Sequence, residues 1–174
     1  DNAGANCVDI GGATGTTYTL TATDVDATIR VRVTGTNAGG SSNASSAPTV
    51  AVAADPPAVV TIPDVTGTAQ DGQTLTATAG TWTGTPTITY TYQWRRCDET
   101  GAGCLDLAGE TGTTYVLTPD DVSYTIRVRV TATNAGGSAS AQSVPTNAVD
   151  PDAPLNTVIP VISGTVRDGE TLSA

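Results

Sequence analysis

The sequence contains no histidine, lysine, methionine or phenylalanine, and it has only 3 cysteines. Without histidine or lysine, none of the abundant serine and threonine hydroxyls has a conventional activating base. No apolar run approaches the ~18 residues of a membrane-spanning helix, and no signal peptide is recognisable. We therefore expect no catalytic residue, no cofactor and no membrane insertion, and we expect the chain to be a window on a longer protein.

Positive charge is also scarce. The 7 basic residues are all arginines and stand against 17 acidic residues, which gives a net charge of -10 and a pI near 4.1. Nucleic acids and anionic membranes both require a basic surface, so neither is expected as a partner. The simplest use of the acidic charge is solubility and mutual repulsion.

What is plentiful is threonine, alanine, glycine and valine, with 38% hydrophobic residues in 174. These are strand and turn formers, whereas strong helix formers are few. The composition predicts an all-β protein.

The stretch from Thr87 to Cys97, TITYTYQWRRC, predicts a central strand. Tyrosines and Trp94 alternate with polar residues, as a half-buried strand requires. Trp94 is the largest apolar side chain near the expected core. The predicted core residues are Trp94, Tyr92, Leu75, Ile126 and Val128, with Trp82 covering one end from a turn-rich GTWTG segment.

An internal repeat organises the whole chain. With Cys7 placed over Cys104, at an offset of 97 residues, residues 1–77 lie over residues 98–174 without a gap and more than half the positions are identical. A fixed period of this size indicates an array of small domains. We expect residues 1–54 to be the C-terminal part of one unit, 55–150 a complete unit and 151–174 the first strands of the next. The proline-rich stretches 53–57 and 150–154 are expected to be stiff linkers.

Within the complete unit, turn signals every 8 to 12 residues predict about seven strands and an immunoglobulin-like sandwich. The segments expected to be strands include 59–62, 74–79, 105–107, 113–117, 125–133 and 138–149, with an Asp71-Gly72 hairpin turn. The motifs GTWTG, YQW, Cys-loop-Cys and TIRVRVTATNAGG resemble the tandem bacterial immunoglobulin-like repeats of large secreted and cell-surface proteins. Tyr124 has the spacing of a tyrosine corner, but Ala27 replaces it in the other copy.

The cysteines Cys97 and Cys104 bracket a glycine-containing loop and predict a disulfide rather than half of a metal site. A zinc site of four ligands cannot be built from three cysteines without histidine. A disulfide implies an oxidising compartment, so the protein is expected outside the cell or on its surface. Cys7 would then pair with a cysteine preceding Asp1.

Polar groups offer weaker hypotheses. The acidic pairs Asp24 and Asp26, Asp120 and Asp121, and Asp150 and Asp152 can be read as calcium ligands or as solvated surface charge, and the second reading is favoured. The strand arginines Arg30, Arg32, Arg127 and Arg129 can bind an anionic glycan or pair with acidic residues, and pairing is favoured. Asn43-Ala44-Ser45 fits a glycosylation acceptor.

The sequence therefore predicts a non-catalytic structural repeat of an extracellular filament, stalk or surface fibre, whose partners are neighbouring repeats. Lateral association with other copies is left open. The alternatives are an adhesin or carbohydrate-binding module, and an accessory region of a secreted multidomain enzyme.

Overall fold

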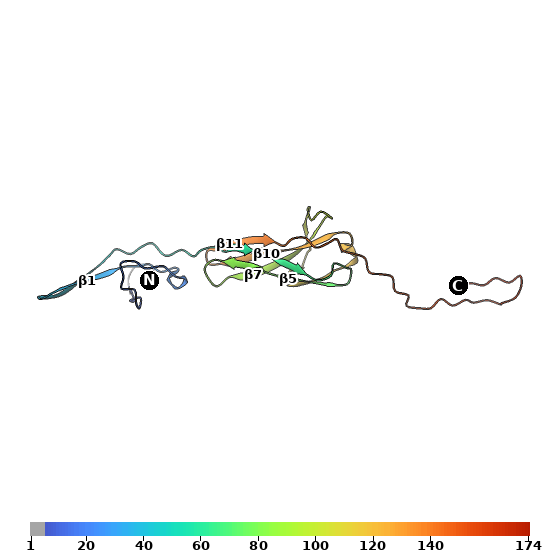
Figure 1. Ribbon diagram of the computed structural model, residues 1–174, viewed down its shortest axis with the longest axis horizontal. Helices are drawn as coiled ribbons and strands as arrows, with labels where there is room; N and C mark the ends of the chain where they lie inside the picture. The colour runs from blue at the N-terminus through green and yellow to red at the C-terminus, as the bar shows by residue number, and fades with distance from the viewer. Residues whose placement is uncertain (1–5) are drawn as a thin grey trace.

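The computed structural model describes residues 6–174, so the first five residues of the predicted N-terminal unit lie outside the described part. The described chain consists of antiparallel β-sheets and two short 3-10 turns, without an α-helix. The all-β prediction is confirmed. Figure 1 shows residues 6–54, the central body and the C-terminal stretch following one another along the longest axis.

The largest sheet has four strands in the order β11-β10-β7-β8. Its two inner strands, β7 (Thr89–Cys97) and β10 (Thr125–Asn134), pair antiparallel with Val128 opposite Trp94. The outer strands are β8 (Leu105–Asp106) and β11 (Gly137–Gln142). The predicted Trp94 strand is thus an inner strand of this sheet.

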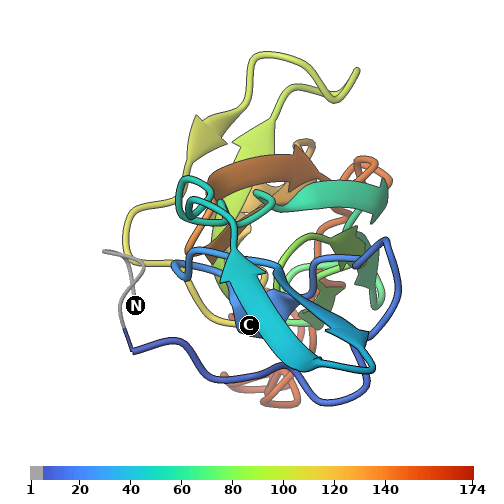
Figure 2. The same cartoon turned by 90° about the vertical axis from the view of Figure 1, so that its left-hand side faces the viewer.

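A second, three-stranded sheet has the order β4-β5-β9. Its strands are β4 (Asp64–Thr66), β5 (Thr74–Thr78) and β9 (Thr114–Val116). Two two-stranded sheets complete the strands. One pairs β3 (Ala58–Thr61) with β6 (Thr81–Thr83), which are not consecutive in the chain, and the other is the hairpin of β1 (Arg32–Asn37) and β2 (Gly40–Ser45). The 3-10 turns are η1 (Ala22–Asp24) and η2 (Pro119–Asp121). In Figure 2, seen along the long axis, the β1–β2 hairpin lies in front of the central body.

Both larger sheets contribute side chains to one apolar core. Leu75, Trp94, Ile126 and Val128 are each 0% exposed. The core also contains Ala77, Tyr115, Leu117, Val130 and Val149. Tyr92, the fifth predicted core residue, is half-buried and packs against this cluster rather than lying inside it.

Several expected elements differ in their extent. The GTWTG segment is not only turn: residues 81–83 form β6, which pairs with β3 because alternating Thr-Trp-Thr can add to an exposed edge. Trp82 still packs against the core. The expected last strand ends at Gln142 rather than continuing to Val149. Pro145 has no N–H to donate to a ladder, and pairing resumes only through single bonds such as Thr146 N–H to the Ile126 carbonyl.

The first linker is packed rather than simply extended. Pro57 is buried, and the backbone of Asp55 hydrogen-bonds to Thr85 in both directions. The stretch 53–57, for which the sequence predicts a stiff linker, is therefore packed, since neighbouring turns supply partners for this backbone. At the other end, residues 151–174 form only an isolated bridge between Ser163 and Ser173.

Residues 6–54 keep the local contacts of the complete copy. Tyr18 donates to Asp24 as Tyr115 does to Asp121. Val25 bridges Val52 as Val122 bridges Val149. In contrast to their counterparts, the apolar side chains here are exposed: Val31 is 57% exposed, whereas Val128 is 0% exposed.

Candidate functional site

A disulfide closes the loop between β7 and β8 on the surface of the central body. Cys97 ends β7 and Cys104 precedes β8, and the structure contains the disulfide predicted between them. Figures 1 and 2 show the β7–β8 connection projecting sideways from the body. Cys97 is buried, whereas Cys104 is half-buried. Cys7 is exposed, and its predicted partner before Asp1 lies outside the described residues.

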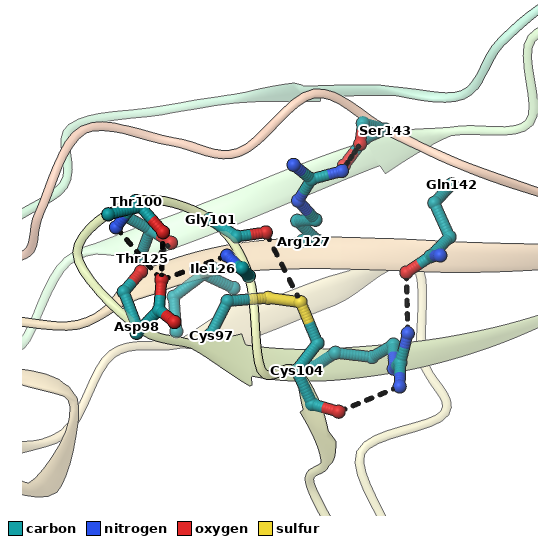
Figure 3. The surroundings of a disulfide bond; sticks show 12 residues. Cys97, Asp98, Thr100, Gly101, Cys104, Thr125, Ile126, Arg127, Gln142 and Ser143 are labelled. Atoms are coloured by element: carbon teal, nitrogen blue, oxygen red, sulfur yellow. Dashed lines mark hydrogen bonds between the residues drawn. A yellow bond between two sulfur atoms is a disulfide. The ribbon is translucent and has the colours of Figure 1, made fainter.

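Asp98 organises the inside of this loop. Its carboxylate accepts hydrogen bonds from the backbone N–H groups of Thr100 and Ala102 and from the Thr100 hydroxyl. These bonds, that of the Thr100 hydroxyl first, hold the pKa of Asp98 below its ordinary value. The hydroxyl of Thr125 on β10 donates to the Asp98 carbonyl, which anchors the loop to the sheet, as Figure 3 shows. Two of the loop's N–H donors are thus occupied by its own carboxylate.

An arginine–aspartate cluster covers the outer face of the four-stranded sheet. Asp106 lies between Arg95 and Arg129, at 2.7 Å and 2.8 Å. Arg95 also donates to the Gln142 side chain and to the Cys104 carbonyl, next to the disulfide (Figure 3). Arg127 donates to the Ser143 carbonyl. All four strands of the sheet and the disulfide are therefore joined across this face.

The same pairing occurs in the first copy, where Arg32 binds Asp9 at 2.9 Å. Pairing of the strand arginines with acidic residues is therefore confirmed for Arg32 and Arg129. Arg30 is exposed.

A buried polar network surrounds Asp121. This residue is 0% exposed and accepts hydrogen bonds from the Tyr115 hydroxyl and from the backbone and hydroxyl of Thr118. Arg96 on β7 forms an ion pair with it at 2.7 Å, and the Arg96 guanidinium lies over the Tyr124 ring. The network ties η2 to β9 and β7.

Charge and burial shift the pKa values in this network. Burial alone raises the pKa of Asp121, but hydrogen bonds from Thr118, Tyr115 and Arg96 outweigh burial and hold that pKa below its ordinary value. Burial raises the pKa of Tyr115 to about 12, and the hydrogen bond to the Asp121 carboxylate and its charge act in the same direction. Asp121 is accordingly a structural anion at neutral pH.

Two interpretations of acidic residues need correction. For Asp24 and Asp121 the sequence predicts solvated surface charge, with calcium ligation as the alternative, yet Asp24 is 7% and Asp121 0% exposed. Each closes a capping box on a 3-10 turn, and this brings the carboxylate inward. The tyrosine that donates is Tyr115 and not Tyr124, which is 45% exposed. The signal was present in the sequence, because a tyrosine precedes the buried aspartate by six residues in both copies.

No arrangement typical of catalysis is found among residues 6–174. No group of three or more potential ligand side chains is placed to hold a metal ion there. No helix in this described part is long and apolar enough to cross a membrane. A shallow hollow on the sheet is lined by side chains of β7 and β10, including Tyr90, Gln93 and Arg129. It contains no nucleophile paired with a base.

The two main polar arrangements of the central body are the ion-paired outer face of the four-stranded sheet and the buried network around Asp121. Comparisons with protein-family models and with curated proteins find no match for this chain.

Proposed function

We propose that the chain is a non-catalytic structural segment built from tandem immunoglobulin-like β-sandwich units, working as a spacer or filament repeat outside the cell. In this reading the four-stranded and three-stranded sheets are the two layers of one sandwich, spanning residues 55–150. Residues 1–54 and 151–174 belong to the preceding and following units.

One observation carries the proposal. Positions that are 97 residues apart share not only sequence but the same local contacts. The tyrosine–aspartate bond, the arginine–aspartate pair and the valine bridge each occur twice. Repetition of the contacts that hold a unit together is what an array of equivalent modules requires.

The distribution of stabilising groups supports a load-bearing role. In the central body, Asp106 forms ion pairs with Arg95 and Arg129 across strands, and the Cys97–Cys104 bond fastens two neighbouring strands. Disulfides of this kind persist outside the cytosol, which supports an extracellular location. The longest strands, β7 and β10, have 9 and 10 residues. At ~3.3 Å per residue, a unit would add on the order of 40 Å to a rod.

Electron microscopy of a series of tandem proteins with increasing numbers of the 97-residue repeat tests this proposal. We expect rods whose length grows by on the order of 40 Å per added repeat. Compact particles whose length does not increase with repeat number would contradict it. Particles that flex freely between repeats would contradict a filament and support a flexible spacer.

A second candidate, a carbohydrate-binding module, is favoured by a single observation. The rings of Trp82 and Tyr90 lie 6.4 Å apart, and Tyr90 is 38% exposed beside the shallow hollow on β7. Exposed aromatic faces are suited to stacking on sugars. Binding on a glycan array that disappears in Tyr90→Ala would support this candidate, and absence of binding would remove it.

A further inference from the structure

The junction before the complete unit is shorter than its sequence suggests. Val52 is still paired with the preceding stretch, since its N–H donates to Ala27 and its carbonyl accepts from Asp26. Asp55 is already paired with the following unit, because it donates to the Thr85 hydroxyl and accepts from the Thr85 N–H. Only residues 53 and 54 lie between these two attachments.

Asn134 is the centre of the attachment to the following unit. Its side-chain Nδ2 donates to the carbonyl of Asp55 and to the carbonyl of Thr85, both at 2.8 Å. Its Oδ1 accepts from the N–H of Gly136 at 2.8 Å, which fixes the orientation of the amide. One side chain on the β10–β11 turn thus joins the incoming chain to the turn after β6.

Two glycines let the incoming chain approach this closely. A Cβ on Gly136 would lie 2.6 Å from the Ala54 carbonyl oxygen and 2.7 Å from Pro56 N. A Cβ on Gly84 would lie 3.0 Å from the Pro56 oxygen. Gly84 also has a φ of +139°, a backbone conformation that residues other than glycine rarely adopt. We call Asn134, Gly136, Gly84 and Thr85 the linker cradle.

We propose that the linker cradle is a docking site for the Asp-Pro segment that enters a unit, so that the junction between successive units is a fixed joint and not a flexible tether. Recognition is of the Asp55 backbone, so it does not require a proline after the aspartate. This agrees with the second linker, where Asp152 is followed by Ala153 in place of Pro56. The turn that holds Asn134 recurs at Asn37, whose Oδ1 likewise accepts from Gly39.

Only the purpose given to the joint, which is to hold successive units in line, rests on the proposed function. The contacts of the linker cradle form within one molecule and can be tested without it. Nuclear magnetic resonance of the full chain tests it by comparing Asn134→Asp with Asn37→Asp. Aspartate keeps the Oδ1 acceptor but turns a carboxylate oxygen toward two carbonyls. We expect the amides of Asp55 and Thr85 to exchange at least ten-fold faster in Asn134→Asp and to be unchanged in Asn37→Asp.

A second pair of variants distinguishes loss of the linker contact from a general folding defect. In Gly136→Ala the new methyl must displace the incoming chain, whereas Gly39→Ala meets only the Asn37 Oδ1 at 3.3 Å. We expect the backbone order parameters of residues 54–57 to be about 0.85 in the parent and below about 0.6 in Gly136→Ala, with Gly39→Ala like the parent. Order parameters below about 0.6 in the parent chain, or unchanged exchange in Asn134→Asp, would overturn the proposal. Neither result depends on whether the protein forms filaments.

Discussion

At the scale of single residues, Trp94 and Asp121 stabilise the central body for opposite reasons. Trp94 is wholly removed from water, lies 5.7 Å from the Tyr115 ring and donates its indole N–H to the Gly112 carbonyl. Asp121 is a charge in the same interior, made tolerable by four donors. Both contact Tyr115, so this residue belongs to the apolar core and to the polar network.

Removing the indole should be the most damaging apolar truncation. We expect Trp94→Ala to lower the free energy of unfolding by about 4 kcal/mol, because a cavity forms and the Gly112 carbonyl loses its donor. Trp82→Ala is the matched control, and since Trp82 is only half-buried we expect a loss of about 1 kcal/mol. Urea unfolding followed by circular dichroism measures both. Equal losses in the two variants would contradict this ranking.

Neutralising the buried carboxylate should also be costly. In Asp121→Asn the amide cannot accept from Arg96, Tyr115 and Thr118 together, so we expect a loss of about 3 kcal/mol. The adjacent Asp120 is exposed, and Asp120→Asn should change stability by less than about 0.5 kcal/mol. Chemical denaturation at neutral pH separates the two. Similar midpoints for both variants would show that the network contributes little.

The shifted pKa values predict how stability depends on pH. Because the pKa of Asp121 is lowered in the folded state, its contribution is present above about pH 4 and is lost as the pH falls through the folded value. Because the pKa of Tyr115 is raised to about 12, its contribution is complete below about pH 10 and is lost as the pH rises toward 12. Denaturation midpoints across the pH range should fall at both ends. Tyr115→Phe should reduce the alkaline loss, and a parent-like alkaline loss in that variant would refute the assignment.

At the scale of elements, β8 is held in place both by the disulfide and by its pairing with β7. β8 has only two residues and pairs with β7 through Arg95 and Arg96. The Asp106 carboxylate and the Cys97–Cys104 bond supply the remaining attachments. In contrast, β7 and β10 pair along nine positions and do not need the bridge.

Removing the disulfide should therefore make the loop more mobile without unfolding the sheet. For a bond between cysteines separated by 7 residues, the chain-entropy relation gives a loss of about 2.5 kcal/mol. We expect Cys97→Ser/Cys104→Ser to unfold cooperatively at a lower urea concentration, with amide protection lost in residues 98–106 and retained in β10. Cys7→Ser in the parent background is the control. Loss of protection in β10 would show that the disulfide holds the whole sheet.

At the scale of the whole molecule, the core is confined to one part of the chain. Every residue of the buried apolar cluster lies between residues 75 and 149. The apolar side chains of the flanking stretches, such as Val31, Val33 and Ile162, are more than half exposed. We expect a protein of residues 55–152 to keep the main unfolding transition within about 1 kcal/mol of the full chain, since separate sites contribute nearly additively. A larger loss of stability on truncation would show that the flanking parts belong to the same cooperative unit.

Residue patterns along the chain were enough to predict the strand-rich character, the Cys97–Cys104 bond and the buried residues Leu75, Trp94, Ile126 and Val128. The reason is that alternation of apolar and polar residues fixes which face of β7 and β10 is buried. The composition and the 97-residue period are visible in the sequence alone. The tertiary structure decided what depends on distant segments meeting: the burial of Asp121 beside Arg96, the addition of β6 to β3, and the capture of Asp55 by Asn134. A residue pattern reports periodicity along one strand, whereas a hydrogen bond between residues 55 and 134 exists only once the chain has folded back on itself.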